Sequence, residues 1–129
     1  MNQKSCTILI VEDNELSLEM AKILLQAAGY KTLEATNAEA GIHLAKEHLP
    51  ALILMDMHLP VKSGYEATRE LKTIPETEHI PIVAFTALAM EEEQKRALAY
   101  GCAGVINKPI DIQNFADTVG SFIKYSIVG

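Results

Sequence analysis

Five short segments, most of them hydrophobic, alternate with longer amphipathic segments along the chain. We expect these five segments to be strands at 7–11, 31–35, 51–56, 81–85 and 104–106. A run such as Leu52-Ile53-Leu54-Met55 is apolar at every position, which is typical of a strand buried on both faces of a parallel sheet. Regular alternation of strand and helix predicts an α/β fold, a parallel sheet with helices on both faces and right-handed crossovers.

The segments between the strands carry helical patterns with recognisable ends. In the first, Leu18, Ala21, Leu25 and Ala28 recur at helical spacing, and Gly29 is a plausible stop. A possible capping box at 36–39 opens the second, which stops before Pro50. The third follows Gly64 and ends before Pro75, and the fourth begins near Met90.

The fifth helical pattern has the clearest apolar face. Asp111 can cap it, and six hydrophobic side chains share one side: Ile112, Phe115, Ala116, Val119, Phe122 and Ile123.

Composition limits the class of protein. The 129 residues suit one domain, and 49% hydrophobic residues predict a packed core. A formal charge of −6 argues against nucleic acid and anionic membranes as partners. We see no membrane-spanning run and no signal peptide, and Cys6 and Cys102 form no disulfide framework. The cytoplasm is the expected location, with both thiols reduced.

Acidic residues follow two of the predicted strands. Glu12 and Asp13 come after the first strand, and Asp56 ends the third. Open α/β sheets bind ligands at the carboxyl ends of their strands. Because three neighbouring carboxylates repel one another, they stay ionised at low cost when a cation joins them. The pattern therefore indicates a divalent metal site.

Two further polar residues belong to the same edge of the sheet. Thr86 follows the fourth strand, with the small Ala87 after it, and Lys108 precedes Pro109 after the fifth. Taken singly, these residues could be a turn hydroxyl and a surface charge, and Glu12 and Asp13 could be solvated or helix-capping acids. As a set they supply oxygens for Mg²⁺ and donors for a phosphoryl group.

With this set of residues, the sequence resembles a response-regulator receiver domain. The matching segments are Ile8-Leu9-Ile10-Val11-Glu12-Asp13-Asn14, Leu54-Met55-Asp56-Met57-His58-Leu59-Pro60 with Gly64, Phe85-Thr86-Ala87, and Asn107-Lys108-Pro109. The resemblance covers about residues 7–124 and implies a single receiver domain over 1–129. It also implies a doubly wound, flavodoxin-like sheet of order 2-1-3-4-5. Within the family the sequence looks closest to stand-alone cell-cycle-type receivers and to receivers of hybrid kinases.

The resemblance implies a role for each residue at the edge. Asp56 would be the phosphoacceptor, taking a phosphoryl group from a phosphohistidine. Asp13, Asp56 and the backbone carbonyl of Met57 would ligate Mg²⁺, for which Mn²⁺ could substitute, and Glu12 would act through a water. Lys108 and Thr86 would contact the phosphoryl oxygens, and the Thr86 shift would bias a two-state surface.

Several positions depart from the family pattern or tune it. Val105 stands where many members carry an aromatic switch residue, so the switch needs another readout. Ser63-Gly64 replaces the common Asp-Gly, with little effect expected. His58 and Leu88 flank the expected path of the attacking water, and Leu88 cannot hydrogen-bond to it, which predicts slow self-dephosphorylation. We expect His58 to face solvent, with metal ligation as the alternative.

The resemblance also implies partners. A histidine kinase or histidine phosphotransfer protein would dock near the first helix, whose second apolar set is Leu16, Met20, Ile23 and Ala27. That set could instead be core. An output partner, not identifiable from the sequence, would bind a face made by the fourth helix, fifth strand and fifth helix. The expected activity is signalling rather than enzymatic.

Three other interpretations fit the sequence less well. A phosphatase of the haloacid-dehalogenase type needs a second Asp two residues after the first, and His58 stands there. A flavin or dinucleotide binder needs a glycine-rich loop after the first strand, where this chain has Glu12-Asp13-Asn14. A degenerate receiver that acts only as an interaction module is disfavoured because all five site residues are present.

Overall fold

The computed structural model describes residues 6–87 and 90–123 and shows one parallel sheet. Its strand order is β2-β1-β3-β4-β5, which confirms the predicted fold class. The strands are β1 (Thr7–Val11), β2 (Lys31–Ala35), β3 (Leu52–Met55), β4 (Ile82–Thr86) and β5 (Gly104–Asn107). Each lies within a residue or two of its predicted bounds. Asp56 falls just outside β3, whereas Thr86 is the last residue of β4.

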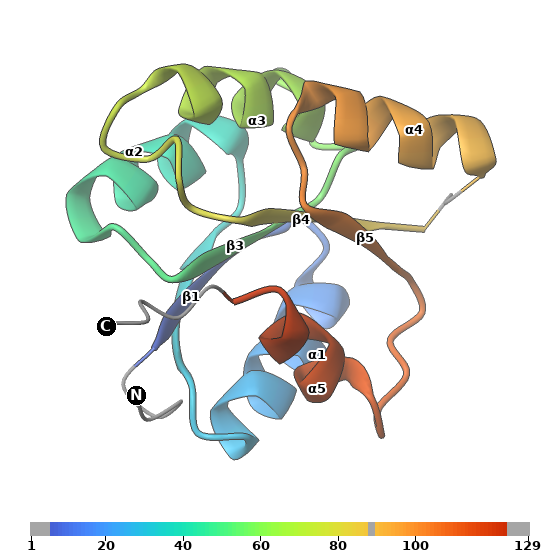
Figure 1. Cartoon of the computed structure of the whole chain (residues 1–129). Coiled ribbons are helices and arrows are strands. Elements are labelled where there is room, and N and C mark those ends of the chain that lie inside the picture. Colours follow the sequence, from blue (N-terminus) through green and yellow to red (C-terminus); the bar gives the residue numbers. More distant parts are fainter. Residues whose placement is uncertain (1–5, 88–89, 124–129) are drawn as a thin grey trace, which may run out of the picture.

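Helices cover both faces of the sheet (Figure 1). One layer holds α2 (Ala38–His48), α3 (Gly64–Thr73) and α4 (Glu91–Tyr100), and the other holds α1 (Glu15–Ala27) and α5 (Phe115–Ser121). Because side chains alternate along a strand, each strand feeds two cores. Leu9 and Ile53 pack under α2–α4, whereas Ile8 and Leu54 pack under α1 and α5.

Local capping sets where the helices begin. Asn14 caps α1 by accepting a hydrogen bond from the Ser17 N–H, and Asn37 caps α2 in the same way. The capping box expected at 36–39 is therefore not the device used at α2, because the cap is one residue further along. A full capping box instead opens α3, between Ser63 and Glu66.

The fifth helix is shorter than predicted. The Asp111 carboxylate accepts hydrogen bonds from the Gln113 N–H at 3.2 Å and the Asn114 side chain at 2.8 Å, so it stabilises a turn rather than the helix itself. α5 begins only at Phe115, and Ile112 in this turn is exposed, which contradicts its predicted place on the buried face. Local hydrogen bonding of Asp competes with helix formation here.

The two cysteines lie on opposite sides of the sheet. Cys6 belongs to the core under α1 and α5, and Cys102 to the core under α2–α4, so both are unpaired and buried. Burial raises the pKa of the Cys102 thiol to about 11. Both behave as small core residues.

None of the helices within residues 6–87 and 90–123 has the length and hydrophobicity needed to cross a bilayer.

Candidate functional site

The three acids meet at the carboxyl edge of the sheet. β1 and β3 are paired with Val11 opposite Met55, and the Asp56 N–H donates to the Val11 carbonyl at 3.0 Å. The residues that follow each strand are therefore neighbours. Carboxylate oxygens of Glu12, Asp13 and Asp56 all lie within 4.8 Å of one another. Glu12 and Asp56 are buried, and Asp13 is exposed.

Lys108 reaches this acidic cluster from the neighbouring part of the sheet. Its N–H donates to the Thr86 carbonyl at 2.9 Å, which extends the β4–β5 pairing to the edge. The Lys108 ammonium contacts Glu12 Oε1 and lies 3.8 Å from Asp56 Oδ2. It also lies 4.8 Å from the centre of the Phe85 ring. One cation is thus shared by the two buried carboxylates.

Burial dominates the ionisation of Glu12. It raises the pKa of this carboxyl group, and the negative charge of Asp56 acts in the same direction. The Lys108 side chain and the Asn14 N–H, which donates to Glu12 Oε2 at 2.9 Å, both lower the pKa and so oppose that shift. The ionised form of Glu12 therefore depends on its donors, and a bound cation would favour it further.

The backbone around Asp56 is closely packed. Asp56 Oδ1 accepts a hydrogen bond from the His58 N–H at 2.9 Å, whereas Oδ2 faces Lys108. The Met57 carbonyl accepts from the Gly64 N–H at 3.1 Å. A Cβ atom on Gly64 would lie 2.1 Å from the Asp56 carbonyl oxygen, so this approach requires glycine.

Thr86 supplies a hydroxyl at the same edge. Its side chain is buried, and Oγ1 has no hydrogen-bond partner among the residues that the structure describes. A buried hydroxyl without a partner is costly, and it is suited to an incoming acceptor oxygen. Ala87 beside it is small and exposed. Leu88, expected to tune dephosphorylation, lies outside the described residues.

His58 makes a contact that the sequence did not reveal. Its ring is half exposed, and Nε2 lies 2.9 Å from Oε1 of Glu93 in α4. The Tyr65 hydroxyl donates to the same oxygen at 3.4 Å. In the described part of the chain, the group that could hold a metal ion comprises the three acids and does not include His58. A pairing across 35 residues leaves no local sequence signal.

Val105 is partly buried and packs against the core under α2–α4. Nearby, the rings of Tyr65 and Tyr100 lie 5.3 Å apart between α3 and α4, and the Arg96 guanidinium lies 4.0 Å from the centre of Tyr65. The aromatic side chains in this region are therefore carried by α3 and α4, and not by the Val105 position of β5.

The site suits a small hard cation. The three acids offer carboxylate oxygens, which are ligands that Mg²⁺ prefers, and Asp13 is exposed to solvent. The two buried acids would gain a counter-charge that a single ammonium only partly supplies.

Comparison with known proteins identifies the family. Residues 8–120 match the model of the response regulator receiver domain. The polar-differentiation response regulator DivK of Brucella anthropi is 43% identical over 117 residues, which cover 91% of this chain and 95% of the relative. This likeness agrees with the predicted resemblance to stand-alone cell-cycle-type receivers.

Solved structures agree with this assignment. The chemotaxis protein CheY4 of Vibrio cholerae superposes with a TM-score of 0.87 at 23% identity, covering 92% of this chain and 98% of that one, which supports the fold. The receiver domain of sensor histidine kinase PA1611 from Pseudomonas aeruginosa has a TM-score of 0.84 and 28% identity. It covers 92% of this chain and 97% of its own, and it has a magnesium ion coordinated in its active site cleft. The chain belongs to the response regulator receiver domain family.

Proposed function

We propose that this receiver accepts a phosphoryl group on Asp56 and relays or switches a signal by doing so. The observation that carries the proposal is the position of Asp56, whose carboxylate lies beside Glu12 and Asp13 and 3.8 Å from the Lys108 ammonium. One edge of the sheet thus joins a nucleophile, a cation site and a phosphoryl-binding donor.

The chemistry is a transfer between two protein side chains. A carboxylate oxygen of Asp56 forms a bond to phosphorus as the bond from phosphorus to the donor imidazole breaks. The imidazole keeps the electron pair of that bond and takes up a proton. The His58 N–H holds Oδ1 of Asp56, so the carboxylate is oriented before the donor arrives.

A divalent cation belongs to this proposal. Asp13, Asp56 and the Met57 carbonyl would hold Mg²⁺ directly, with Glu12 acting through a water, and Mn²⁺ could take its place. The cation supplies charge neutralisation for the incoming phosphoryl oxygens. The receiver from Pseudomonas aeruginosa, with its coordinated magnesium ion, supports this part of the proposal.

The response would begin at Thr86 and Lys108. Once Asp56 carries the phosphoryl group, the Thr86 hydroxyl can donate to one of its oxygens, which satisfies a buried group that has no hydrogen-bond partner within 6–87 and 90–123. Lys108 can exchange its Glu12 contact for the new negative charge. The movement would bias the face made by α4, β5 and α5, where an output partner binds.

The absence of an aromatic at Val105 requires another readout. Glu93 of α4 already contacts His58, which is two residues from the phosphoacceptor, and it accepts from Tyr65 of α3. These contacts offer a connection from the site to α4 that does not involve β5.

The donor would be a histidine kinase or a histidine phosphotransfer protein docked near α1. Of the second apolar set of α1, Leu16 and Ile23 are exposed and Met20 is partly buried. This exposure favours a docking surface over core packing. Two buried, unpaired thiols fit the reducing conditions of the cytoplasm, where we place the protein.

The test is phosphorylation with acetyl phosphate or phosphoramidate in Mg²⁺. We expect the intact mass to rise by one phosphoryl group, with no such rise for Asp56→Asn or after chelation of Mg²⁺. We also expect a phosphoryl lifetime longer than seconds, since Leu88 cannot orient a water. An unmodified wild-type protein would support the degenerate receiver instead.

A further inference from the structure

The loop between β3 and α3 contains a strained residue. Val61 has a φ of 69°, and the Lys62 N–H donates to the Pro60 carbonyl at 2.9 Å, which closes a three-residue turn around Val61. Such turns with a positive φ at their centre are rare, and a β-branched residue there is an outlier. Because the Val61 side chain is fully exposed, its own packing offsets none of this strain.

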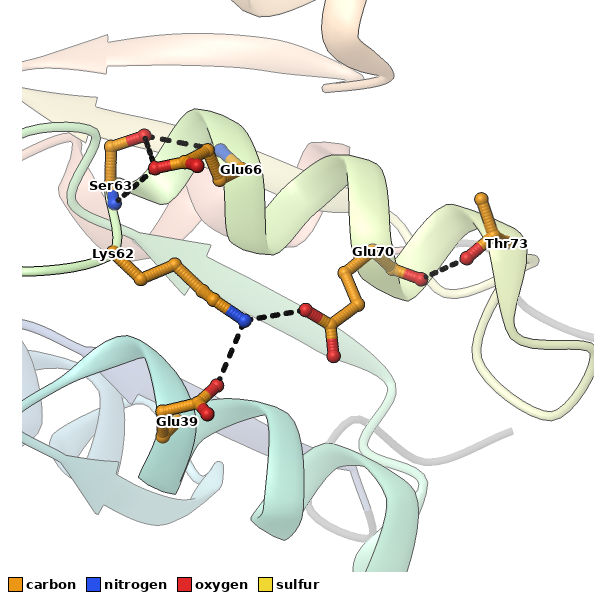
Figure 2. A network of polar contacts seen from close by, with 6 residues as sticks. All are labelled: Glu39, Lys62, Ser63, Glu66, Glu70 and Thr73. Carbon is orange, nitrogen blue, oxygen red and sulfur yellow. Dashed lines mark hydrogen bonds and ion pairs between the residues drawn. The ribbon is translucent and has the colours of Figure 1, made fainter.

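Lys62 supplies the missing restraint. Its ammonium lies 2.6 Å from Glu70 Oε1 in α3 and 3.0 Å from Glu39 Oε1 in α2 (Figure 2). The hydrogen bonds to Glu70 and Glu39 raise the pKa of Lys62 to about 12. The loop is thus tied by one side chain to two helices.

A mostly apolar depression lies between this part of the loop and α2. Its lining residues are Asn37, Ala38, Glu39, Pro60, Val61 and Lys62. Lys62 reaches Glu39 at this depression, so a charge pair stands where side-chain packing is sparse.

The restraint acts close to the phosphoacceptor. Ser63 follows Lys62 and caps α3, and the Gly64 N–H then donates to the Met57 carbonyl at 3.1 Å. Gly64 also approaches the Asp56 backbone too closely for any side chain. The position of residues 62–64 therefore determines where the Met57 carbonyl points.

We propose that Lys62 is a positioning residue for the phosphoacceptor site. By bridging Glu39 and Glu70 it offsets the strain at Val61 and keeps the Met57 carbonyl in the orientation that a cation requires. This inference rests on the proposed function, because it concerns the same cation site. It adds to the site a residue outside the acidic cluster, and it assigns the strained turn at Val61 a structural role in that site.

The experiment compares the Mg²⁺ affinity of the wild type, Lys62→Met, Val61→Gly and the double variant. Titration is followed through the amide resonances of residues 57–59 and 61–64 and by calorimetry. We expect Lys62→Met to weaken Mg²⁺ binding about three- to tenfold. This is less than the roughly 10- to 100-fold typical of losing a direct outer partner of a metal ligand, because Lys62 acts on the Met57 carbonyl only through residues 63 and 64. Val61→Gly should restore affinity in the Lys62→Met background, because glycine adopts the positive φ without strain.

The direction of the change in Mg²⁺ affinity distinguishes a positioning role of Lys62 from a purely electrostatic effect of its charge. Removing a positive charge from the loop would by electrostatics alone favour a cation, so that explanation predicts tighter binding. Lys95→Met is the matched control, since Lys95 pairs with one carboxylate, Glu91, on the exposed surface of α4. It should leave Mg²⁺ affinity unchanged. Glu39→Gln, which removes one arm of the bridge, should give a smaller loss than Lys62→Met.

Two results would overturn the inference: unchanged or tighter Mg²⁺ binding by Lys62→Met, or no recovery on adding Val61→Gly. If Lys62→Met does not fold, Glu39→Gln and its combination with Val61→Gly decide in the same way. Failure of the proposed function looks different, because the wild type itself would then neither bind Mg²⁺ nor accept a phosphoryl group.

Discussion

Glu12 is a fully buried carboxylate, and its ionised state depends on the ammonium of Lys108. Asp56, close by, is buried as well, so two negative charges share one cation whose side chain is 15% exposed. Opposite charges out of water are costly to separate, since the charge left behind is no longer solvated. The stability of this edge of the sheet should therefore depend on a single lysine.

We predict that Lys108→Met lowers the free energy of unfolding by about 2–3 kcal/mol at pH 7 without metal, near the lower end of values for buried pairs. Burial already raises the pKa of Glu12, and loss of Lys108 removes a group that opposes this shift. In the folded variant Glu12 binds a proton, whereas in the unfolded chain Glu12 releases it above the ordinary pKa of 4.5. Because the folded state binds more protons, the stability of the variant should recover as the pH falls from 7 toward 5.

Urea unfolding at several pH values measures this effect, with Lys95→Met as the surface control. Added Mg²⁺ should also restore stability, because a cation replaces the ammonium. A variant as stable as the wild type across this pH range would show that the charges are screened by solvent.

At the scale of elements, the loop from β3 to α3 is constrained at three points. Its Gly64 end lies against the Asp56 backbone, its middle holds Val61 at a φ of 69°, and its His58 end contacts α4. Helix α1, in contrast, presents exposed apolar side chains beside the acidic edge. The loop constrains the backbone beside Asp56, and α1 carries the exposed apolar side chains on which we propose that the donor docks.

We predict that Gly64→Ala destabilises the fold by about 1–3 kcal/mol, the usual cost of overpacking, and also weakens Mg²⁺ binding. The added Cβ would lie 2.1 Å from a backbone oxygen, which cannot move as a side chain end can. Thermal unfolding and Mg²⁺ titration measure the two effects. Gly101→Ala is a suitable comparison, because the atoms nearest to its Cβ belong to the Lys72 side chain, at 3.0 Å, rather than to the backbone beside Asp56, and its φ of 118° adds strain. It should lower stability while leaving Mg²⁺ affinity intact.

We predict that Leu16→Ala and Met20→Ala slow phosphotransfer from a histidine-bearing donor several-fold while changing stability by less than about 1 kcal/mol. Leu16 is 70% exposed, and Met20 lines a shallow apolar depression with Ile23, Leu24 and Ile112. Phosphorylation by acetyl phosphate needs no docked protein, so its rate is the internal control. Equal slowing with both donors would place the defect in the site rather than in docking.

At the scale of the whole molecule, the sheet brings together residues from four separate connections. Glu12 and Asp13 follow β1, Asp56 follows β3, Thr86 ends β4 and Lys108 follows β5. These residues become neighbours only because their strands pair in one sheet, so the site exists only in the folded state. A ligand that binds this arrangement and not the unfolded chain must stabilise the fold.

We predict that Mg²⁺ raises the melting temperature in a saturable way, since binding at about 100 times Kd contributes about 2.7 kcal/mol. Asp13→Asn should abolish most of this shift, because it removes a proposed ligand of Mg²⁺. Asp13 is the exposed member of the acidic cluster, so its replacement perturbs the core least. Scanning calorimetry over a Mg²⁺ series measures it. The same shift in Asp13→Asn would indicate that the ion binds elsewhere.

Much of the fold follows from local patterns. Continuous apolar runs predict β1, β3 and β4, and the alternation with helical patterns places β2 and β5. The polar residues at the ends of β1, β3, β4 and β5 indicated one functional edge. The positions at which helices begin were harder to predict. Asp111 stabilises a turn, so α5 begins only at Phe115, and Asn37 rather than Thr36 caps α2. Both outcomes depend on a competition between nearby hydrogen bonds of similar energy.

The sequence by itself determined the order of strands and helices along the chain. It also determined which polar residues follow the strands: the three acids, the hydroxyl of Thr86 and the ammonium of Lys108. These features depend on neighbours along the chain. Tertiary structure alone decided that Lys108 contacts Glu12 as well as Asp56, that His58 meets Glu93, and that Lys62 bridges two helices. These pairs join residues 8 to 96 positions apart, as with Lys62 and Glu70 or Glu12 and Lys108. Such contacts depend on how helices and loops pack on the sheet, and no periodicity along the chain encodes them.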